Sequence, residues 1–549
     1  MRKKILLLIG LVAVASVSFA QTLSQDWNTT IGELRTNAFD NDLVYIDAAG
    51  NTYVTGIFTE DVSIGSSYLE QLGESAYLAK LNSAGDILWA VALQGYVTPK
   101  QITTDSDGNV YIACIFDGEI ILGSTNNATE TLTGNDAYGE QKNTVFAKYD
   151  ANGVLKNSDA YLYDLEDWLF GYAKVAPVGL SVVNNTVYLG LSIAGKTQIG
   201  NTEFSGYTFL HEEFYMDINL NSMYILAFDK DLNYQKKVAC VEFTDADAYA
   251  KITSFTMTAD EENLYAAFYA PATLKISAGT ASYTIESEYG DDMYYRNFSI
   301  FRINPAGNID FHKSFQSKNM ISAYAIGYEE VKHSFISNNA WIITGNYNDT
   351  FIFDESAPET GTYDSAPYFV IFNKEAGNET KTYYGETNTT LNSSAVGNAL
   401  VFSTYNDSDA TSTLYAYDFG TRNIATLETT AANTSINGVA ASGEKISVSR
   451  ATAGDGIAAV AVSKHTLSNL SGIETPTAKA TEIKLYPNPA VDVINLSEAC
   501  DVTIVNIQGS VVKAASASTQ IPVTELNAGY YVAKIKTTEG VTVIPFIKK

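Results

Sequence analysis

Two segments of this chain combine tyrosines with carboxylates closely enough to suggest a binding site. One runs from His211 to Asp217 and the other from Glu286 to Arg296, and both lie between stretches that alternate apolar and polar residues as β-strands do. Tyrosine rings flanked by hydrogen-bonding carboxylates can hold a sugar ring or a protein side chain. We therefore predict a surface that binds a protein or glycan ligand, built from Tyr215, Tyr289, Asp291, Asp292, Tyr294 and Tyr295.

The same two segments have a second interpretation, in which each forms an extra outer hairpin. In that arrangement tyrosines pack on tyrosines across the two strands, and the acidic side chains are solvated. The sequence leaves both interpretations open.

No metal site and no cofactor is predicted. Residues Asp105 to Asn109 carry oxygen-bearing side chains at alternate positions, as the start of a calcium loop does. However, Val110 stands where such a loop needs glycine, and Phe116 stands where it needs glutamate. A hairpin turn explains the same residues without a metal. The four histidines are far apart in the sequence, which does not fit a zinc site.

Motifs of familiar enzyme classes are absent from the sequence. There is no Gly-x-Ser-x-Gly, no His-Glu-x-x-His and no glycine-rich phosphate loop. Carboxylate pairs are common, but a chain with 62 acidic residues contains such pairs by chance. We therefore expect a binding or scaffold protein. A carbohydrate-active enzyme, a hydrolase or a lyase on the same scaffold, is the alternative.

The charge balance argues against nucleic acid as a partner. The chain has 34 basic and 62 acidic residues and a net charge of −28, whereas nucleic-acid phosphates need a basic footprint. Three cysteines at wide spacing do not make a disulfide framework. Cys114 and Cys240 fall within strand patterns, so we expect buried free thiols, with a disulfide between them as the alternative.

Residues 1–20 predict a secretory signal peptide. A basic start at residues 2–4 is followed by a short apolar run at residues 5–17 and by small residues at the end. A membrane anchor is the alternative, but the run is shorter than the ~20 residues that a membrane-spanning helix needs. No later segment is long and apolar enough to be one, so we expect no transmembrane segment in the mature chain.

A repeated pair of hairpins organises residues 21–470. Residues Asp47–Phe58 align without a gap with Asp105–Phe116, and each segment has an Asp/Gly/Asn turn between alternating strands. A second hairpin follows each of them, so one unit has four strands. The first turn recurs, in weaker copies, around residues 185, 263, 339, 398 and 444. Seven four-stranded units predict an all-β fold, a seven-bladed β-propeller.

The first two units resemble the bacterial β-propeller repeat of secreted and surface proteins, through their Asp-x-x-Gly-Asn-x-Tyr hairpins. The resemblance implies a scaffold rather than a particular chemistry. The seventh unit lacks a convincing fourth strand, while residues 23–32 resemble the fourth strand of the first unit, residues 88–95. We predict that residues 23–32 complete the last blade, and that the two tyrosine-rich segments are neighbouring loops on one face.

The C-terminal segment predicts a separate small domain. After a linker at residues 471–481, short alternating strands fill residues 482–549, as in a small Ig-like β-sandwich. This segment closely resembles the C-terminal sorting domain of type IX (Por) secretion, through Leu485, Tyr486, Pro487, Asn488, Pro489, Gly529 and the terminal Phe546-Ile547-Lys548-Lys549. The resemblance implies a Gram-negative source and the type IX machinery as partner. It also implies export through the inner and outer membranes, which leaves the protein secreted or attached to the outer cell surface.

Overall fold

The computed structural model divides the chain into two compact units, Met1–Ser471 and Gly472–Lys549. It describes residues 22–34, 43–135, 142–164, 174–211, 216–245, 251–252, 254–271, 273–286, 289–290, 293–294, 296–316, 321–322, 330–337, 340–347, 366–374, 379–384, 392–406, 410–419, 424–453, 458–468, 485–506, 511–537 and 540–549. These residues form strands and turns and no helix. The predicted signal peptide and linker lie outside them.

Antiparallel four-stranded groups build the first unit, and within each group every strand pairs with the next. The first two groups share one long strand, because the first half of β7 pairs with β6 and its second half pairs with β8. Their strands are β2 (Leu43–Ile46), β3 (Thr52–Phe58), β6 (Ser75–Leu81), β7 (Ile87–Thr104), β8 (Val110–Gly123), β10 (Asn143–Tyr149) and β11 (Leu155–Tyr161).

The later groups follow the same order. The third and fourth are β12 (Lys174–Val183), β13 (Thr186–Ala194), β18 (Ser222–Phe228) and β19 (Tyr234–Asp245), then β20 (Ser254–Ala259), β21 (Leu264–Pro271), β26 (Arg296–Ile303) and β27 (Ile309–Gln316). The fifth and sixth are β29 (Glu330–Ser337), β30 (Ala340–Tyr347), β31 (Ala366–Asn373) and β32 (Glu379–Tyr384), then β33 (Asn392–Val396), β34 (Ala399–Asn406), β35 (Thr411–Asp418) and β36 (Ile424–Thr429). The last is β37 (Thr434–Ser442), β38 (Lys445–Ala453), β39 (Ala458–Ser468) and β1 (Thr22–Leu34).

Short strands decorate these groups, mostly as hairpins inserted between the second and third strands. They are β4 (Val62–Ile64), β5 (Ser67–Leu69), β9 (Thr129–Thr133), β14 (Lys196–Ile199), β15 (Thr202–Ser205), β16 (Tyr207–His211), β17 (Met216–Leu220), β22 (Thr273–Ala278), β23 (Ala281–Ile285), β24 (Tyr289–Gly290), β25 (Met293–Tyr294) and β28 (Ile321–Ser322).

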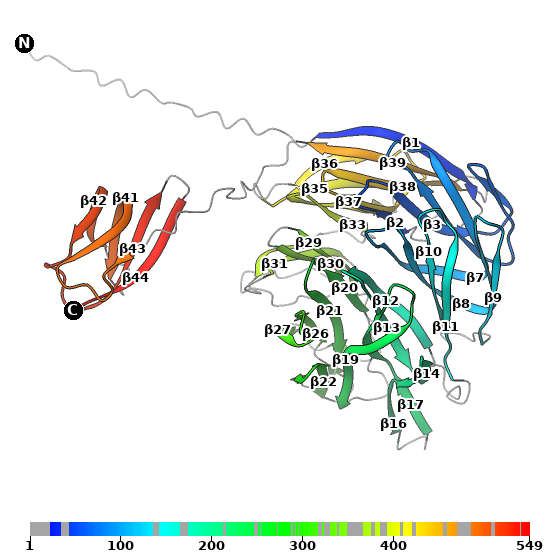
Figure 1. The fold of residues 1–549 in the computed structure, drawn as a ribbon, viewed down its shortest axis with the longest axis horizontal. Coiled ribbons are helices and arrows are strands. Elements are labelled where there is room, and N and C mark those ends of the chain that lie inside the picture. Colours follow the sequence, from blue (N-terminus) through cyan, green and yellow to red (C-terminus); the bar gives the residue numbers. More distant parts are fainter. Residues whose placement is uncertain are drawn as a thin grey trace, which may run out of the picture. The chain divides into compact units, whose positions relative to one another are not determined.

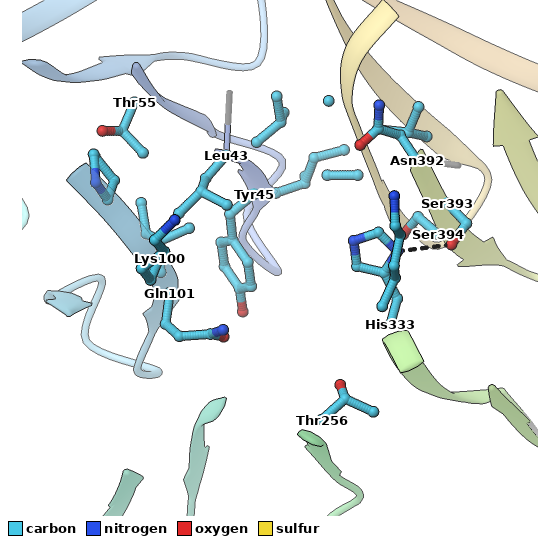
Figure 2. Close-up of a pocket in the computed structure, with 18 of the residues that line it drawn as sticks. Leu43, Tyr45, Thr55, Lys100, Gln101, Thr256, His333, Asn392, Ser393 and Ser394 are labelled. Atoms are coloured by element: carbon cyan, nitrogen blue, oxygen red, sulfur yellow. Dashed lines mark hydrogen bonds between the residues drawn. The ribbon is translucent and has the colours of Figure 1, made fainter. Parts of the chain in front are cut away.

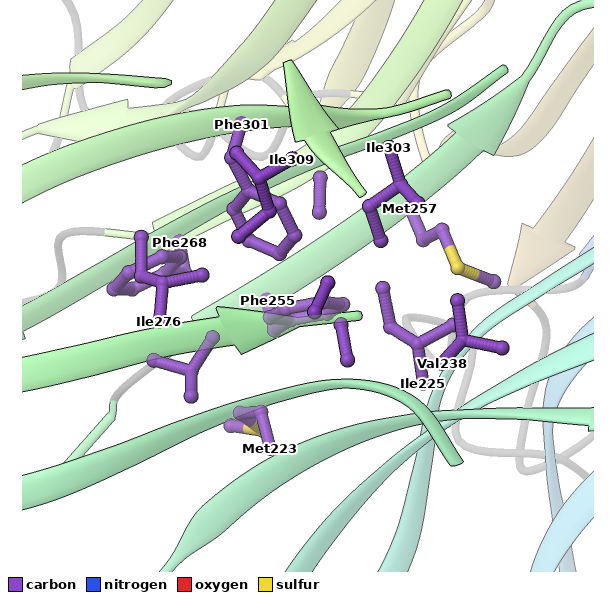
Figure 3. Packing of buried hydrophobic residues seen from close by; sticks show 14 of the residues in the cluster. Met223, Ile225, Val238, Phe255, Met257, Phe268, Ile276, Phe301, Ile303 and Ile309 are labelled. Carbon is purple, nitrogen blue, oxygen red and sulfur yellow. The ribbon is translucent and has the colours of Figure 1, made fainter. Parts of the chain in front are cut away.

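Apolar side chains fill the space between consecutive sheets. Figure 3 shows the cluster between the third and fourth groups, to which Ile225 and Val238 contribute from one sheet and Met257 and Phe301 from the next. Corresponding clusters join the other neighbours along the chain. One more cluster joins the last group to the first and includes Ile31, Val460 and Val54, so the array of sheets closes on itself.

The first strands of the groups surround the axis of this closed array. Among the described residues they neighbour one another in the order β2, β7, β12, β20, β29, β33, β37 and again β2. Sheets that pack face to face about an axis, with their first strands innermost, form a β-propeller, which confirms the predicted fold class. The number of seven blades stays a prediction, and this order of strands agrees with it.

The N-terminal strand belongs to the last sheet. β1 pairs antiparallel with β39, from Thr22 opposite Ser468 to Leu34 opposite Ala458, and Figure 1 shows the two strands side by side. Residues from both ends of the first unit thus share one sheet. Whether this pairing acts as a stabilising latch stays a prediction.

The second unit has its own core. Its strands are β40 (Leu485–Tyr486), β41 (Val493–Asn506), β42 (Val511–Pro522), β43 (Gly529–Thr537) and β44 (Gly540–Lys548), paired in the order β40-β41-β43-β44 with β42 also beside β41. Ile494, Ile504, Ile535 and Phe546 are buried together. Elsewhere in the chain Cys114 and Cys240 are buried free thiols, as predicted. Among the described residues no helix could serve as a membrane span.

Candidate functional site

A cavity of about 620 Å³ lies at the axis of the propeller. Its wall is built from β2, β7, β20, β29, β33 and β37, together with part of β3. Pockets that hold small ligands have volumes of this order. Since its wall combines residues from both ends of the propeller sequence, the cavity exists only because the array of sheets closes.

Strand edges supply backbone hydrogen-bonding groups to this wall. In the described pairings β2, β20, β29 and β33 are each the end strand of their sheet, so one edge of each has no strand partner. Such an edge carries alternating N–H and C=O groups that need hydrogen-bond partners. Because the first strands surround the axis, these edges can offer donors and acceptors to a ligand or to water.

Neutral polar side chains also reach the cavity. Figure 2 shows Tyr45 of β2 and Gln101 of β7 on one side of it. His333 of β29 lies on the other side, and Thr256 of β20 lies lower in the same view. The described residues of the wall include no aspartate or glutamate. The site offers hydroxyl, amide and imidazole groups, and its wall also includes Lys100 and Lys332, beside apolar surface such as that of Leu43.

His333 contacts one hydroxyl group directly, and that hydroxyl contacts a second one. Its Nδ1 atom lies 3.0 Å from the Oγ atom of Ser393, which in turn lies 2.8 Å from the Oγ1 atom of Thr344. Burial, and next the positive charge of the adjacent Lys332, lower the pKa of His333 to about 4. The imidazole is therefore neutral at neutral pH, and it can donate or accept a hydrogen bond at the cavity wall.

The loop site predicted from the sequence is described only in part. Tyr289 of β24 and Tyr294 of β25 stand opposite each other in register, and β25 also pairs with β28. Of the other segment, His211 ends β16 and stands opposite Met216 of β17. The described backbone of both segments thus pairs as strands, and both interpretations stay predictions. The remaining predicted residues lie outside the described ones: Tyr215, Asp291, Asp292 and Tyr295. The binding role of all six residues stays a prediction.

Sequence reasoning did not find the residues of the cavity. A usable signal was present, because Tyr45, Gln101, Thr256 and His333 each lie a few residues before the turn that joins a first strand to a second one. Polar side chains at equivalent places of several repeats indicate a shared environment. The aromatic and acidic loops are a stronger local pattern in the sequence than these scattered polar residues.

The sorting motif and the C-terminus of the chain meet in the second unit. The Oδ1 atom of Asn488 accepts a hydrogen bond from the backbone N–H of Ile547 at 3.0 Å, and the N–H of Ala490 donates to the carbonyl oxygen of Ile547 at 2.7 Å. Gly529, at the start of β43, stands opposite Lys548. The segments that carry the resemblance are therefore parts of one folded element.

Solved β-propeller structures are similar to this chain at low sequence identity. The Dos1 propeller is 11% identical, with a TM-score of 0.37 and coverage of 81% of this chain and 95% of that one. Virginiamycin B lyase from Staphylococcus aureus is 11% identical, with a TM-score of 0.35 and coverage of 82% and 100%. The periplasmic gluconolactonase of Pseudomonas aeruginosa is 11% identical, with a TM-score of 0.36 and coverage of 90% and 98%. The propeller assignment itself rests on the strand pairings and core clusters described above.

The second unit matches a known protein family. Residues 484–549 match the secretion system C-terminal sorting domain, and this span includes the Leu485–Pro489 motif, Gly529 and the C-terminus. None of the curated proteins compared with the sequence matches it. Residues 484–549 are thus a type IX (Por) sorting domain, which directs this β-propeller protein to the cell surface or into the medium.

Proposed function

We propose that this protein binds a sugar unit of a glycan in the axial cavity of its propeller. The observation that carries the proposal is the cavity of about 620 Å³, whose described wall joins neutral polar side chains to open strand edges and apolar surface. A sugar presents several hydroxyl groups close together, so it needs closely spaced donors and acceptors. Export to the cell surface or beyond it gives the protein access to such ligands.

The cavity residues provide a direct test. Glycan-array screening of the mature full-length protein, followed by calorimetry with the best free sugar, measures the affinity. Gln101→Leu and Tyr45→Phe remove polar groups at nearly constant volume, and each should weaken binding by about tenfold, because a buried partner loses its hydrogen bond. Gln198→Leu and Tyr68→Phe make the same changes at exposed positions outside the cavity and should leave the affinity unchanged. Equal affinities for all four variants and the wild type would contradict the proposal.

A hydrolytic enzyme is the second candidate, and the contact between His333 and Ser393 favours it. A serine hydroxyl within hydrogen-bond reach of an imidazole is the arrangement by which a base activates a nucleophile. However, the side chain of Ser393 belongs to a residue that is only 2% exposed, and its hydroxyl also contacts Thr344. Ser393→Ala separates the two functions, since it would abolish hydrolysis of an ester or glycoside probe but leave the binding of the sugar.

A further inference from the structure

Several first strands have an irregular register at a similar place. The register of β7 against β8 shifts around Lys100, and that of β29 against β30 shifts around Lys332. β12 and β37 have the same irregularity around Val178 and Asn437. A bulge of this kind leaves one residue without a cross-strand partner and changes the direction of its side chain. Because the bulges recur at a similar place in four first strands, they are a regular feature of the propeller.

Two of these bulged residues are lysines, and both line the axial cavity. The first strands form a circle about the axis. In one direction around this circle, β12 and β20 lie between β7 and β29, and in the other direction β2, β37 and β33 lie between them. Lys100 and Lys332 therefore belong to opposite sides of the wall. Figure 2 shows this separation for Lys100 and for His333, the chain neighbour of Lys332.

The charge of the wall is opposite to the charge of the chain. The protein has 62 acidic residues against 34 basic ones, yet the described residues of the cavity wall include two lysines and no carboxylate. The charges of the two lysines also act on neighbouring groups. The charge of Lys332 adds to the effect of burial in lowering the pKa of His333. Burial raises the pKa of the Cys114 thiol, and the charge of Lys100 opposes that rise.

We infer that the ligand of the axial cavity is an acidic sugar, held through its negative charge by Lys100 and Lys332. The inference rests on the proposed function and specifies its ligand class. An ammonium group is a compact charge that attracts carboxylate and sulfate alike. The hydroxyl, amide and imidazole groups between the two lysines suit the hydroxyl groups of the same ligand.

Matched pairs of sugars test the inference. Calorimetry on the mature full-length protein compares glucuronate with glucose, and galacturonate with galactose, so that only the carboxylate differs within each pair. At least one uronate should bind roughly tenfold more tightly than its neutral parent, the difference expected for a charge-assisted contact. The difference should shrink as salt is added, because salt screens the lysine charges. Free sulfate at constant ionic strength should compete with the uronate.

Substitutions assign the effect to the two lysines. Lys100→Met and Lys332→Met should each remove most of the preference for the uronate, whereas Lys100→Arg and Lys332→Arg should retain it. Lys156→Met, on the exposed side of β11, is the matched control, and melting curves establish that every variant is folded. Equal binding of uronate and neutral sugar, or an unchanged preference in both methionine variants, overturns the acidic ligand and leaves the proposed sugar binding. Absence of binding for all four sugars at millimolar concentrations overturns both.

Discussion

Trp27 and Trp89 make the same hydrogen bond at two successive places in the propeller. The indole Nε1 of Trp27 donates to the carbonyl oxygen of Ser83 at 3.0 Å, and that of Trp89 donates to the carbonyl oxygen of Ala151 at 3.1 Å. Both acceptors lie in the turn after the third strand of the next sheet. Trp27 belongs to β1 and Trp89 to the outer half of β7, so the N-terminal strand takes the place of a fourth strand in the last sheet.

Deletion of residues 21–33 should therefore destabilise the propeller strongly. The deletion removes β1 from β39 and takes Ile31 and Trp27 from the apolar cluster that joins the last sheet to the first. We expect the melting temperature in scanning calorimetry to fall by at least about 10 °C. Trp27→Phe, which keeps an aromatic ring but removes the indole N–H and some apolar volume, should cause a much smaller fall. An unchanged melting temperature after the deletion would mean that β1 does not hold the array closed.

Asp260, in the turn between β20 and β21, should contribute more to the free energy of unfolding than Tyr265, whose hydroxyl group it binds. Asp260 accepts hydrogen bonds from the N–H groups of Glu262 and Asn263, from the hydroxyl of Tyr265 at 2.8 Å and from Lys374 at 3.2 Å. Burial alone would raise its pKa, but these donors together lower the pKa of Asp260 to about 2. Asp260→Ala should cost about 2 kcal/mol of unfolding free energy and Tyr265→Phe about 1 kcal/mol. Urea unfolding at pH 7 measures both, and a larger cost for Tyr265→Phe would reverse this order.

Acid should destabilise the propeller through His333 and His465. Burial first, and then a nearby cation, lower the pKa of His333 and that of His465 to about 4; the cations are Lys332 and Arg450 respectively. An unfolded histidine has a pKa of about 6.5, so the unfolded chain binds more protons than the folded one below that value. The two histidines thus cost no stability above about pH 6.5. As the pH falls toward about 4, each lowers the free energy of unfolding by up to about 3 kcal/mol.

Substitution of both histidines tests this pH dependence. His333→Asn combined with His465→Asn should flatten the stability profile between about pH 6.5 and about pH 4, even where the variant is less stable at pH 7. Urea unfolding of both proteins across this range gives the two slopes. Equal slopes would assign the acid sensitivity to carboxylates and not to these side chains.

Removal of the sorting domain should keep the propeller inside the cell envelope. A chain truncated after Thr475 lacks the whole of residues 484–549, which match the sorting family. We expect its accumulation in the periplasm, measured by fractionation and by protease treatment of intact cells. Asn488→Ala, which removes the hydrogen bond to the N–H of Ile547, should reduce surface exposure in part. Normal surface display of the truncated chain would reject the sorting role.

The tyrosine-rich loops give a second, independent prediction about binding. If they form the ligand surface that the sequence suggests, replacement of Tyr289, Tyr294 and Tyr295 with alanine should abolish ligand binding while the melting temperature stays the same. If the axial cavity is the site, the triple variant should bind the sugar as the wild type does. Calorimetry and melting curves on this variant and on Gln101→Leu separate the two sites.

Local sequence patterns were enough to predict the strands and turns of the propeller. The turn residues Asp47, Asp105 and Asp260 bind the asparagine and tyrosine that follow them in their own hairpins, so short-range chemistry alone marks these turns. The bulges at Lys100 and Lys332 could not be predicted in this way, because a bulge depends on the register of a neighbouring strand.

The sequence by itself determined that this protein is an all-β repeat array with an export signal at its C-terminus, since strands, turns and short motifs depend on residues close together in the chain. Only the tertiary structure decided that Tyr45, Gln101, Lys100 and His333 share one cavity. These residues come from different sheets, and they meet because the last sheet packs on the first and turns every first strand toward a common axis.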